Sequence, residues 1–289
     1  MNGDEAIDGK LQPEGAQTAQ DICALPLVRR LAALLDRDPL TLNDGDPLPH
    51  GWHVILFNPP TRQSALRPDG AAELGVPLPD LGLPRLMMGG RQMSFVAPIP
   101  IGARVTRVSQ LKAVTEKQGR SGRFALVDIE QQLTVEGSAV AAVTGTTSYI
   151  LLGARKAEDA APVQPRTLGN SSALPGKILA QRVIVPDTAM LFRYSAITDN
   201  PHRIHYDLAY AQQAEGFPAL VVNGTVPILL LLEMFKASVG REPARLVTRN
   251  LAPIYCGRDL SLSVAVLDDG WALRAVDNHG TLCMSATAQ

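Results

Sequence analysis

The chain has 289 residues, 46% of them hydrophobic, so it can bury one large core or two small ones. Its 27 basic and 28 acidic residues nearly cancel, so no net charge attracts nucleic acid or an anionic membrane, and we expect neither as a partner. The three cysteines share no CxxC spacing, which argues against a disulfide framework and a structural zinc site and favours a reducing, cytoplasmic location.

The N-terminal segment, residues 1–21, is polar and acidic and has no basic region followed by an apolar stretch, as a secretory signal would. We expect it to be a leader that orders late or not at all. The most apolar segment, residues 217–235, is interrupted by polar residues, glycine and proline. It is therefore not expected to cross a bilayer.

Two similar segments, PIPIGARV at 98–105 and PIYCGRDL at 253–260, suggest an internal repeat. Three stretches of strand-like character follow each copy, separated by turns rich in Gly, Asn and Asp. The expected strands are 106–115, 123–135 and 139–151 in the first half, and 261–267, 271–276 and 282–288 in the second. Both halves thus end in an antiparallel meander, which predicts a duplicated fold.

The segment between the halves, residues 153–176, contains prolines and serines and shows little periodicity. We expect it to be a linker. It separates a first module, residues 22–152, from a second module, residues 177–289, which we expect to be the catalytic one.

A helix is predicted from Val226, with Thr225 or Asn223 as N-cap, to a stop at Gly240. It is apolar on nearly every face, so protein must surround it. A curved antiparallel sheet wrapped around one helix, the hotdog fold, meets this demand. We expect an α+β double hotdog, two curved antiparallel sheets each wrapping a central helix, although residues 79–93 of the first module look too broken by Gly and Pro for a helix.

The densest cluster of reactive side chains is the segment YSAITDNPHRIHYD at 194–207. It contains two of the five histidines, His202 and His205, while the others are remote and show no zinc-like spacing. No metal is expected. A plain polar loop that enters a helix is the alternative interpretation of this cluster.

This segment resembles the signature of the MaoC-like hydratase and dehydratase superfamily, in which an Asp or Asn precedes a His with the spacing of Asn200 and His205. It is more similar to the two-module branch that includes mesaconyl-CoA and itaconyl-CoA hydratases and fungal 3-hydroxyacyl-thioester dehydratases. The motif at 200–207 and the EGFP segment at 215–218 match that branch, as do PRLMMGG at 84–90 and TEKQGRSG at 115–122.

The resemblance implies an acyl-CoA hydro-lyase that interconverts an enoyl-CoA and a 3-hydroxyacyl-CoA. His205 would be the base that activates water. Asn200 would hold the water or orient the imidazole, since an amide cannot itself be a base. Asp199 either supplies the carboxylate that other members place at the position of Asn200, or simply caps a turn.

The oxyanion hole is expected at the start of the apolar helix, where Gly224 and Thr225 would offer backbone N–H groups to the thioester oxygen. Family members commonly have His before this Gly, whereas this chain has Asn223. The departure motivates an alternative enzyme on the same fold, a thioesterase or a biosynthetic cyclase. A non-catalytic acyl-thioester binding module is the third alternative.

Several side chains are candidates to bind the substrate. Arginines can pair with a carboxylate or with the phosphates of coenzyme A, and Arg203 is the first choice because it lies within the motif. The other candidates are Tyr194, His202, Arg85, Arg91 and Arg193. We expect coenzyme A as the carrier of a short branched or dicarboxylic acyl group, no further cofactor, a small-molecule partner only, and either a monomer or a homodimer.

Overall fold

The computed structural model describes residues 15–58, 60–72, 76–119, 122–154 and 176–289. The first half contributes five strands: β1 (Gln17–Ile22), β2 (Arg85–Phe95), β3 (Arg104–Gly119), β4 (Gly122–Val135) and β5 (Ala141–Leu152). The second half contributes five more: β6 (Lys177–Ile184), β7 (Arg245–Asn250), β8 (Leu260–Leu267), β9 (Gly270–Asp277) and β10 (Leu282–Ala288). All ten form one antiparallel sheet in the order β1-β3-β4-β5-β2-β7-β10-β9-β8-β6.

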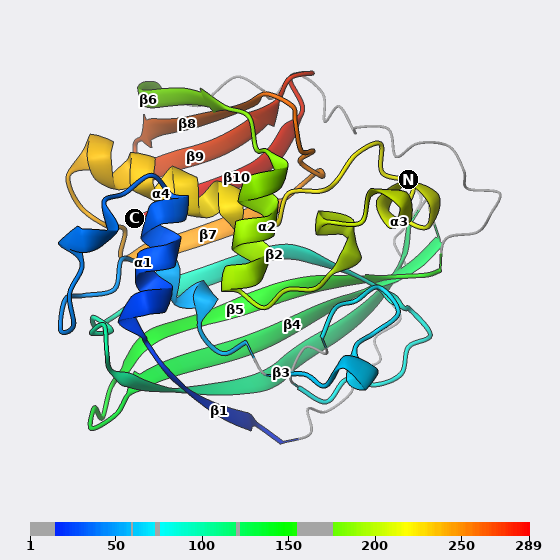
Figure 1. Cartoon of the computed structure of the whole chain (residues 1–289), viewed down its shortest axis with the longest axis horizontal. Helices are drawn as coiled ribbons and strands as arrows, with labels where there is room; N and C mark the ends of the chain where they lie inside the picture. The colour runs from blue at the N-terminus through cyan, green and yellow to red at the C-terminus, as the bar shows by residue number, and fades with distance from the viewer. Residues whose placement is uncertain (1–14, 59, 73–75, 120–121, 155–175) are drawn as a thin grey trace.

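The helices lie inside the curve of this sheet, as Figure 1 shows. The α-helices are α1 (Leu25–Leu34), α2 (Thr188–Ile197), α3 (Leu208–Gln213) and α4 (Val226–Val239). Short 3-10 helices are η1 (Pro39–Thr41), η2 (Trp52–Ile55), η3 (Gln63–Ala65) and η5 (Arg203–His205). The expected α+β double hotdog is confirmed, and its two sheets join edge to edge where β2 pairs with β7.

The repeat is visible in matching hydrogen bonds. The Gly102 amide donates to the Cys23 carbonyl in the first half, and the Gly257 amide donates to the Pro186 carbonyl in the second, both at 2.7 Å. The two glycines share a left-handed backbone, with φ of +88° and +76°. A duplicated strand entry therefore precedes β3 and β8, as the sequence predicts.

A second pair of matching bonds locates the first-half counterpart of α4. Ile99 and Ile254 hold the same place in the repeat, and their carbonyls accept from the amides of Leu48 and Val222, each at 2.8 Å. Leu48 stands four residues before η2, just as Val222 stands four residues before α4. The first half thus differs from the expectation of a central helix in each sheet, because the short helix η2 begins where α4 begins in the second half.

The residues suspected of being too broken for a helix are partly strand, since 85–93 belong to β2. The structure also corrects the end of the expected polar leader. Gln17–Ile22 pairs with β3, and Asp21 accepts a hydrogen bond from the Phe57 amide at 2.7 Å. The earlier part of that leader and nearly all of the expected linker lie outside the described residues.

The helix α4 is surrounded by protein, as its composition predicts. Eight of its residues are buried, and it packs against β6, β8 and β9. It ends at Gly240, whose left-handed φ of +79° is a conformation that favours glycine. No helix in the described ranges is long and apolar enough to span a membrane. A homodimer stays a prediction.

We expect Leu231→Ala to lower the free energy of unfolding by about 2 to 5 kcal/mol, because Leu231 is fully buried and its truncation leaves a cavity in the core. Urea denaturation monitored by circular dichroism measures this. Leu40→Ala is the matched control, since Leu40 is 73% exposed and should change the stability by less than about 0.5 kcal/mol. Equal effects of the two substitutions would show that α4 does not anchor the core.

Candidate active site

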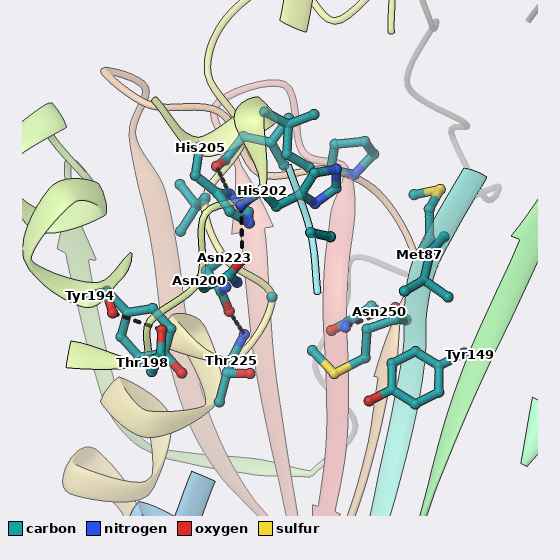
Figure 2. Close-up of a pocket in the computed structure, with 18 of the residues that line it drawn as sticks. Met87, Tyr149, Tyr194, Thr198, Asn200, His202, His205, Asn223, Thr225 and Asn250 are labelled. Carbon is teal, nitrogen blue, oxygen red and sulfur yellow. Dashed lines mark hydrogen bonds between the residues drawn. The ribbon is translucent and has the colours of Figure 1, made fainter. Parts of the chain in front are cut away.

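A cavity of about 470 Å³ lies between the two halves of the sheet. The first half lines it from β2, β3, β5 and the loops around η2 and η3, and the second half lines it from the motif around η5, the loop before α4 and the end of β7. All predicted site residues except Arg193 and Arg203 line it: Tyr194, Asp199, Asn200, His202, His205, Asn223, Gly224, Thr225, Arg85 and Arg91. Figure 2 shows several of them.

The His205 ring is held in one orientation by the backbone. It is buried, with 6% exposure, and its Nδ1 lies 2.7 Å from the Val221 carbonyl oxygen. A carbonyl can only accept, so Nδ1 carries the proton and Nε2 keeps its lone pair. Burial lowers the pKa of His205 to about 4. The imidazole is therefore neutral near pH 7 and able to act as a base.

The same contact ties the histidine to the start of α4. The Val221 amide donates to the Ile204 carbonyl at 3.0 Å, while the Val221 carbonyl accepts from His205. This reciprocal pair joins η5 to the loop that leads into α4. His205 and the residues just before α4, among them Asn223 and Thr225, line the same cavity (Figure 2).

Asn200 follows a strained turn. Asp199 has a left-handed φ of +44°, which Asp tolerates better than most residues, and its side chain is exposed at the cavity rim. The Asn200 Oδ1 accepts from the His202 amide at 3.1 Å. Since this bond occupies Oδ1, the Nδ2 group of Asn200 remains as a hydrogen-bond donor at the cavity wall.

The start of α4 differs from the expected arrangement in one respect. The Asn223 Oδ1 accepts from the Thr225 amide at 3.1 Å, and the Asn223 carbonyl accepts from the Val226 amide at 2.9 Å. Thr225 therefore has no free N–H to offer, which corrects its expected role in the oxyanion hole. The Gly224 amide has no acceptor among the residues described, and Gly224 lines the cavity, so its N–H is a candidate donor there.

Gly224 also approaches the sheet closely. A Cβ atom at this position would lie 2.9 Å from the Asn250 Nδ2 and 3.2 Å from the Met88 Cε. The Asn250 side chain is itself fixed, because its Nδ2 donates to the Met88 carbonyl at 3.0 Å. The helix thus begins directly over the junction of β2 and β7, and only glycine fits there without displacement.

The structure corrects the choice of Arg203 as the main substrate-binding arginine. Its guanidinium bonds Asp207 at 2.8 and 3.1 Å and lies over the Tyr210 ring at 4.1 Å, outside the cavity lining. Arg203 instead stiffens the motif. Arg193 is exposed and also lies outside the lining.

Arg85 lines the cavity but is already paired. Its guanidinium contacts the Glu215 carboxylate at 2.8 and 2.9 Å. Glu215 belongs to the EGFP segment, so this ion pair connects β2 of the first half to the motif of the second half. Arg85 is therefore available for positioning the motif and less so for binding a free anion.

Sequence reasoning missed Asp69, a buried carboxylate supplied by a first-half loop. Its backbone carbonyl accepts from the Arg203 amide at 2.9 Å, and its Oδ2 lies 3.2 Å from Arg67 and 4.0 Å from the His202 Nε2. Burial lowers the pKa of His202 and the Asp69 charge opposes this shift. No local pattern marks Asp69, because the motif residues that it contacts, His202 and Arg203, are distant in the chain.

Further cavity residues that the sequence did not reveal are Glu215, Arg107, Tyr149 and Asn250. Arg107 lies over the Phe57 ring at 4.9 Å, and burial lowers its pKa. Of the side chains in the described ranges, no three or more His, Cys, Asp or Glu are grouped so that they could hold a metal ion.

The low pKa of His205 predicts acid sensitivity. The unfolded chain binds a proton at this residue near pH 6.5 and the folded chain only near pH 4, so stability falls as the pH drops through this window. His205→Asn keeps a donor toward Val221 but does not titrate. Between pH 7 and 4.5 we expect its free energy of unfolding to fall by about 2 kcal/mol less than that of the native chain. Urea unfolding at both pH values measures this, and equal losses would contradict the assigned neutral state.

The chain matches the model of the family Hydroxyacyl-thioester dehydratase type 2 over residues 51–256. Mesaconyl-C(4)-CoA hydratase of Chloroflexus aurantiacus is 32% identical over 273 residues, which are 94% of this chain and 94% of the relative. The similarity therefore extends through both halves.

Solved structures agree in fold. HtdX of Mycobacterium tuberculosis superposes with a TM-score of 0.64 at 20% identity, covering 95% of this chain and 99% of that one. A MaoC-like dehydratase gives a TM-score of 0.67 at 14% identity, covering 94% and 97%. The sequence match and this architecture together show that the chain belongs to the family of type 2 hydroxyacyl-thioester dehydratases, MaoC-like hydro-lyases with a double hotdog fold.

Proposed function

We propose that this hydro-lyase adds water to the carbon-carbon double bond of a short dicarboxylic enoyl-CoA, such as mesaconyl-C(4)-CoA, and forms the corresponding 3-hydroxyacyl-CoA. One observation carries the proposal: a neutral imidazole and a helix-end amide without an acceptor face the same cavity. The full-length similarity to a mesaconyl-C(4)-CoA hydratase supports the substrate class and coenzyme A as carrier. A cytoplasmic location stays a prediction.

The chemistry follows from the two groups. The His205 Nε2 removes a proton from a water molecule that the Asn200 Nδ2 holds, and the hydroxyl adds to the carbon β to the thioester. The electron pair of the double bond moves toward the thioester oxygen, where the Gly224 N–H and the positive end of α4 stabilise it. The imidazolium then delivers its proton to the α-carbon, which restores the neutral histidine.

The other predicted residues take supporting roles in this proposal. Asp199 shapes the turn before Asn200, since its side chain is exposed at the rim. Asn223 fixes the helix start through its bond to the Thr225 amide. Asn223 thus has a structural role at this helix end, and nothing observed there favours the thioesterase or cyclase alternative.

We expect His205→Ala to lower kcat for hydration by about 10² to 10⁴, the usual contribution of a general acid-base group. Loss of the enoyl-thioester absorbance measures the rate, and a chromogenic thiol reagent in a parallel assay detects thioester cleavage. His279→Ala is the matched control, because His279 is exposed and lies outside the cavity lining. An unchanged rate in His205→Ala would refute the base, and rapid thiol release would indicate a thioesterase.

Gly224→Ala should lower kcat about tenfold or more while the chain still folds, because its methyl group would displace Asn250 or Met88 and shift the N–H that stabilises the oxyanion. Gly153→Ala serves as a control, since that glycine follows β5, has no left-handed φ and has no described atom within 4 Å of an added Cβ. Full activity of Gly224→Ala would place the oxyanion donor elsewhere.

A further inference from the structure

Arg91 enters the cavity at the junction of the two halves. It lies on β2 opposite Thr248 of β7, and its backbone amide donates to the Thr248 Oγ1 at 2.9 Å. The start of α4 lies over this same junction, as the contacts of Gly224 with Asn250 and Met88 show. The guanidinium of Arg91 therefore reaches the cavity close to the proposed oxyanion donor.

The neighbours of Arg91 support this placement. Its charge acts on the buried phenol of Tyr194, whose hydroxyl hydrogen bonds with Thr225, the residue just before α4. Its charge also acts on His53, and burial together with this charge lowers the pKa of His53 to about 3. His53 is consequently neutral and adds no positive charge beside Arg91.

Arg91 has no counter-ion in the part of the chain that the structure describes. The two buried carboxylates of the cavity are engaged elsewhere, Asp69 with Arg67 and Glu215 with Arg85. Asp199 is exposed at the rim. A half-buried guanidinium beside neutral groups is costly to desolvate without an anion, so a negatively charged group of the ligand would complete the site.

A dicarboxylic acyl-CoA has two kinds of anion that Arg91 could bind, the free carboxylate and the phosphates of coenzyme A, and the position of Arg91 favours the carboxylate. In mesaconyl-C(4)-CoA only the double bond separates the free carboxylate from the thioester carbon, so the carboxylate must lie beside the oxyanion donor. The phosphates of coenzyme A lie at the far end of the pantetheine arm. A planar guanidinium also matches a carboxylate with two parallel hydrogen bonds.

We propose that Arg91 binds the free carboxylate of the substrate and so selects dicarboxylic over neutral enoyl thioesters, an inference that rests on the proposed function. The side chain lines the same cavity as Gly224, and no carboxylate of the described residues pairs with it. Arg91 is thus a specificity-determining residue, and removal of its charge should affect one class of substrate and not the other.

The test compares Arg91→Gln and Arg91→Lys with the native enzyme on mesaconyl-C(4)-CoA and on 3-methylcrotonyl-CoA, which has a methyl group in place of the carboxylate. We expect Arg91→Gln to lose roughly 30-fold or more in kcat/KM on the dicarboxylic ester and less than about threefold on the neutral one. Arg91→Lys should have an intermediate kcat/KM on the dicarboxylic ester, because an ammonium keeps the charge but not the two parallel hydrogen bonds of a guanidinium. Arg193→Gln, which removes an exposed charge outside the cavity, should change neither.

A binding measurement separates this inference from the proposed hydration. Isothermal titration with methylsuccinyl-CoA and isovaleryl-CoA, which have no double bond to hydrate, should show that Arg91→Gln weakens only the dicarboxylic ligand. That result supports the assignment even if the native enzyme hydrates neither enoyl ester, in which case the proposed function alone fails. Equal weakening of both ligands, or no weakening, overturns the role of Arg91. A thermal melt confirms that the variants remain folded.

Discussion

The candidate site depends on the contact between the His205 ring and the Val221 carbonyl. This bond places the proton on Nδ1 and leaves Nε2 as the basic nitrogen. It also ties η5 to the loop that leads into α4. A base and a helix-end donor are useful only if their separation is constant. A single backbone carbonyl thus holds both elements, and burial keeps the imidazole neutral.

The two halves of the sheet repeat the same strand entry but differ in the length of their central helix. Matching hydrogen bonds of Gly102 and Gly257 show the repeat, yet α4 has a counterpart of only four residues, Trp52–Ile55, in the first half. First-half strands then line a cavity together with the second-half motif. The duplicated halves are therefore unequal, yet both contribute to one cavity.

Two carboxylates that line the cavity form ion pairs with arginines, whereas Arg91 forms none with the described residues. Arg85 with Glu215 joins β2 to the motif of the second half. Arg67 with Asp69 is an ion pair within the first-half loop whose Asp69 carbonyl accepts from the Arg203 amide. Such half-buried pairs position neighbouring groups more than they stabilise the fold. Arg91, beside neutral His53 and Tyr194, has no such partner in the described ranges and therefore points to the ligand.

By itself the sequence determined the local features of this protein: the two meanders, the apolar helix α4 and the motif with Asn200 and His205. These depend on periodicity, turn residues and short spacings, which neighbouring residues impose on one another. Only the tertiary structure decided that Arg203 pairs with Asp207, that Asn223 uses up the Thr225 amide and that Asp69 joins the site. The first two are settled by rotamers, which a sequence does not display, and Asp69 reaches the motif only because the sheet brings residues distant in the chain together.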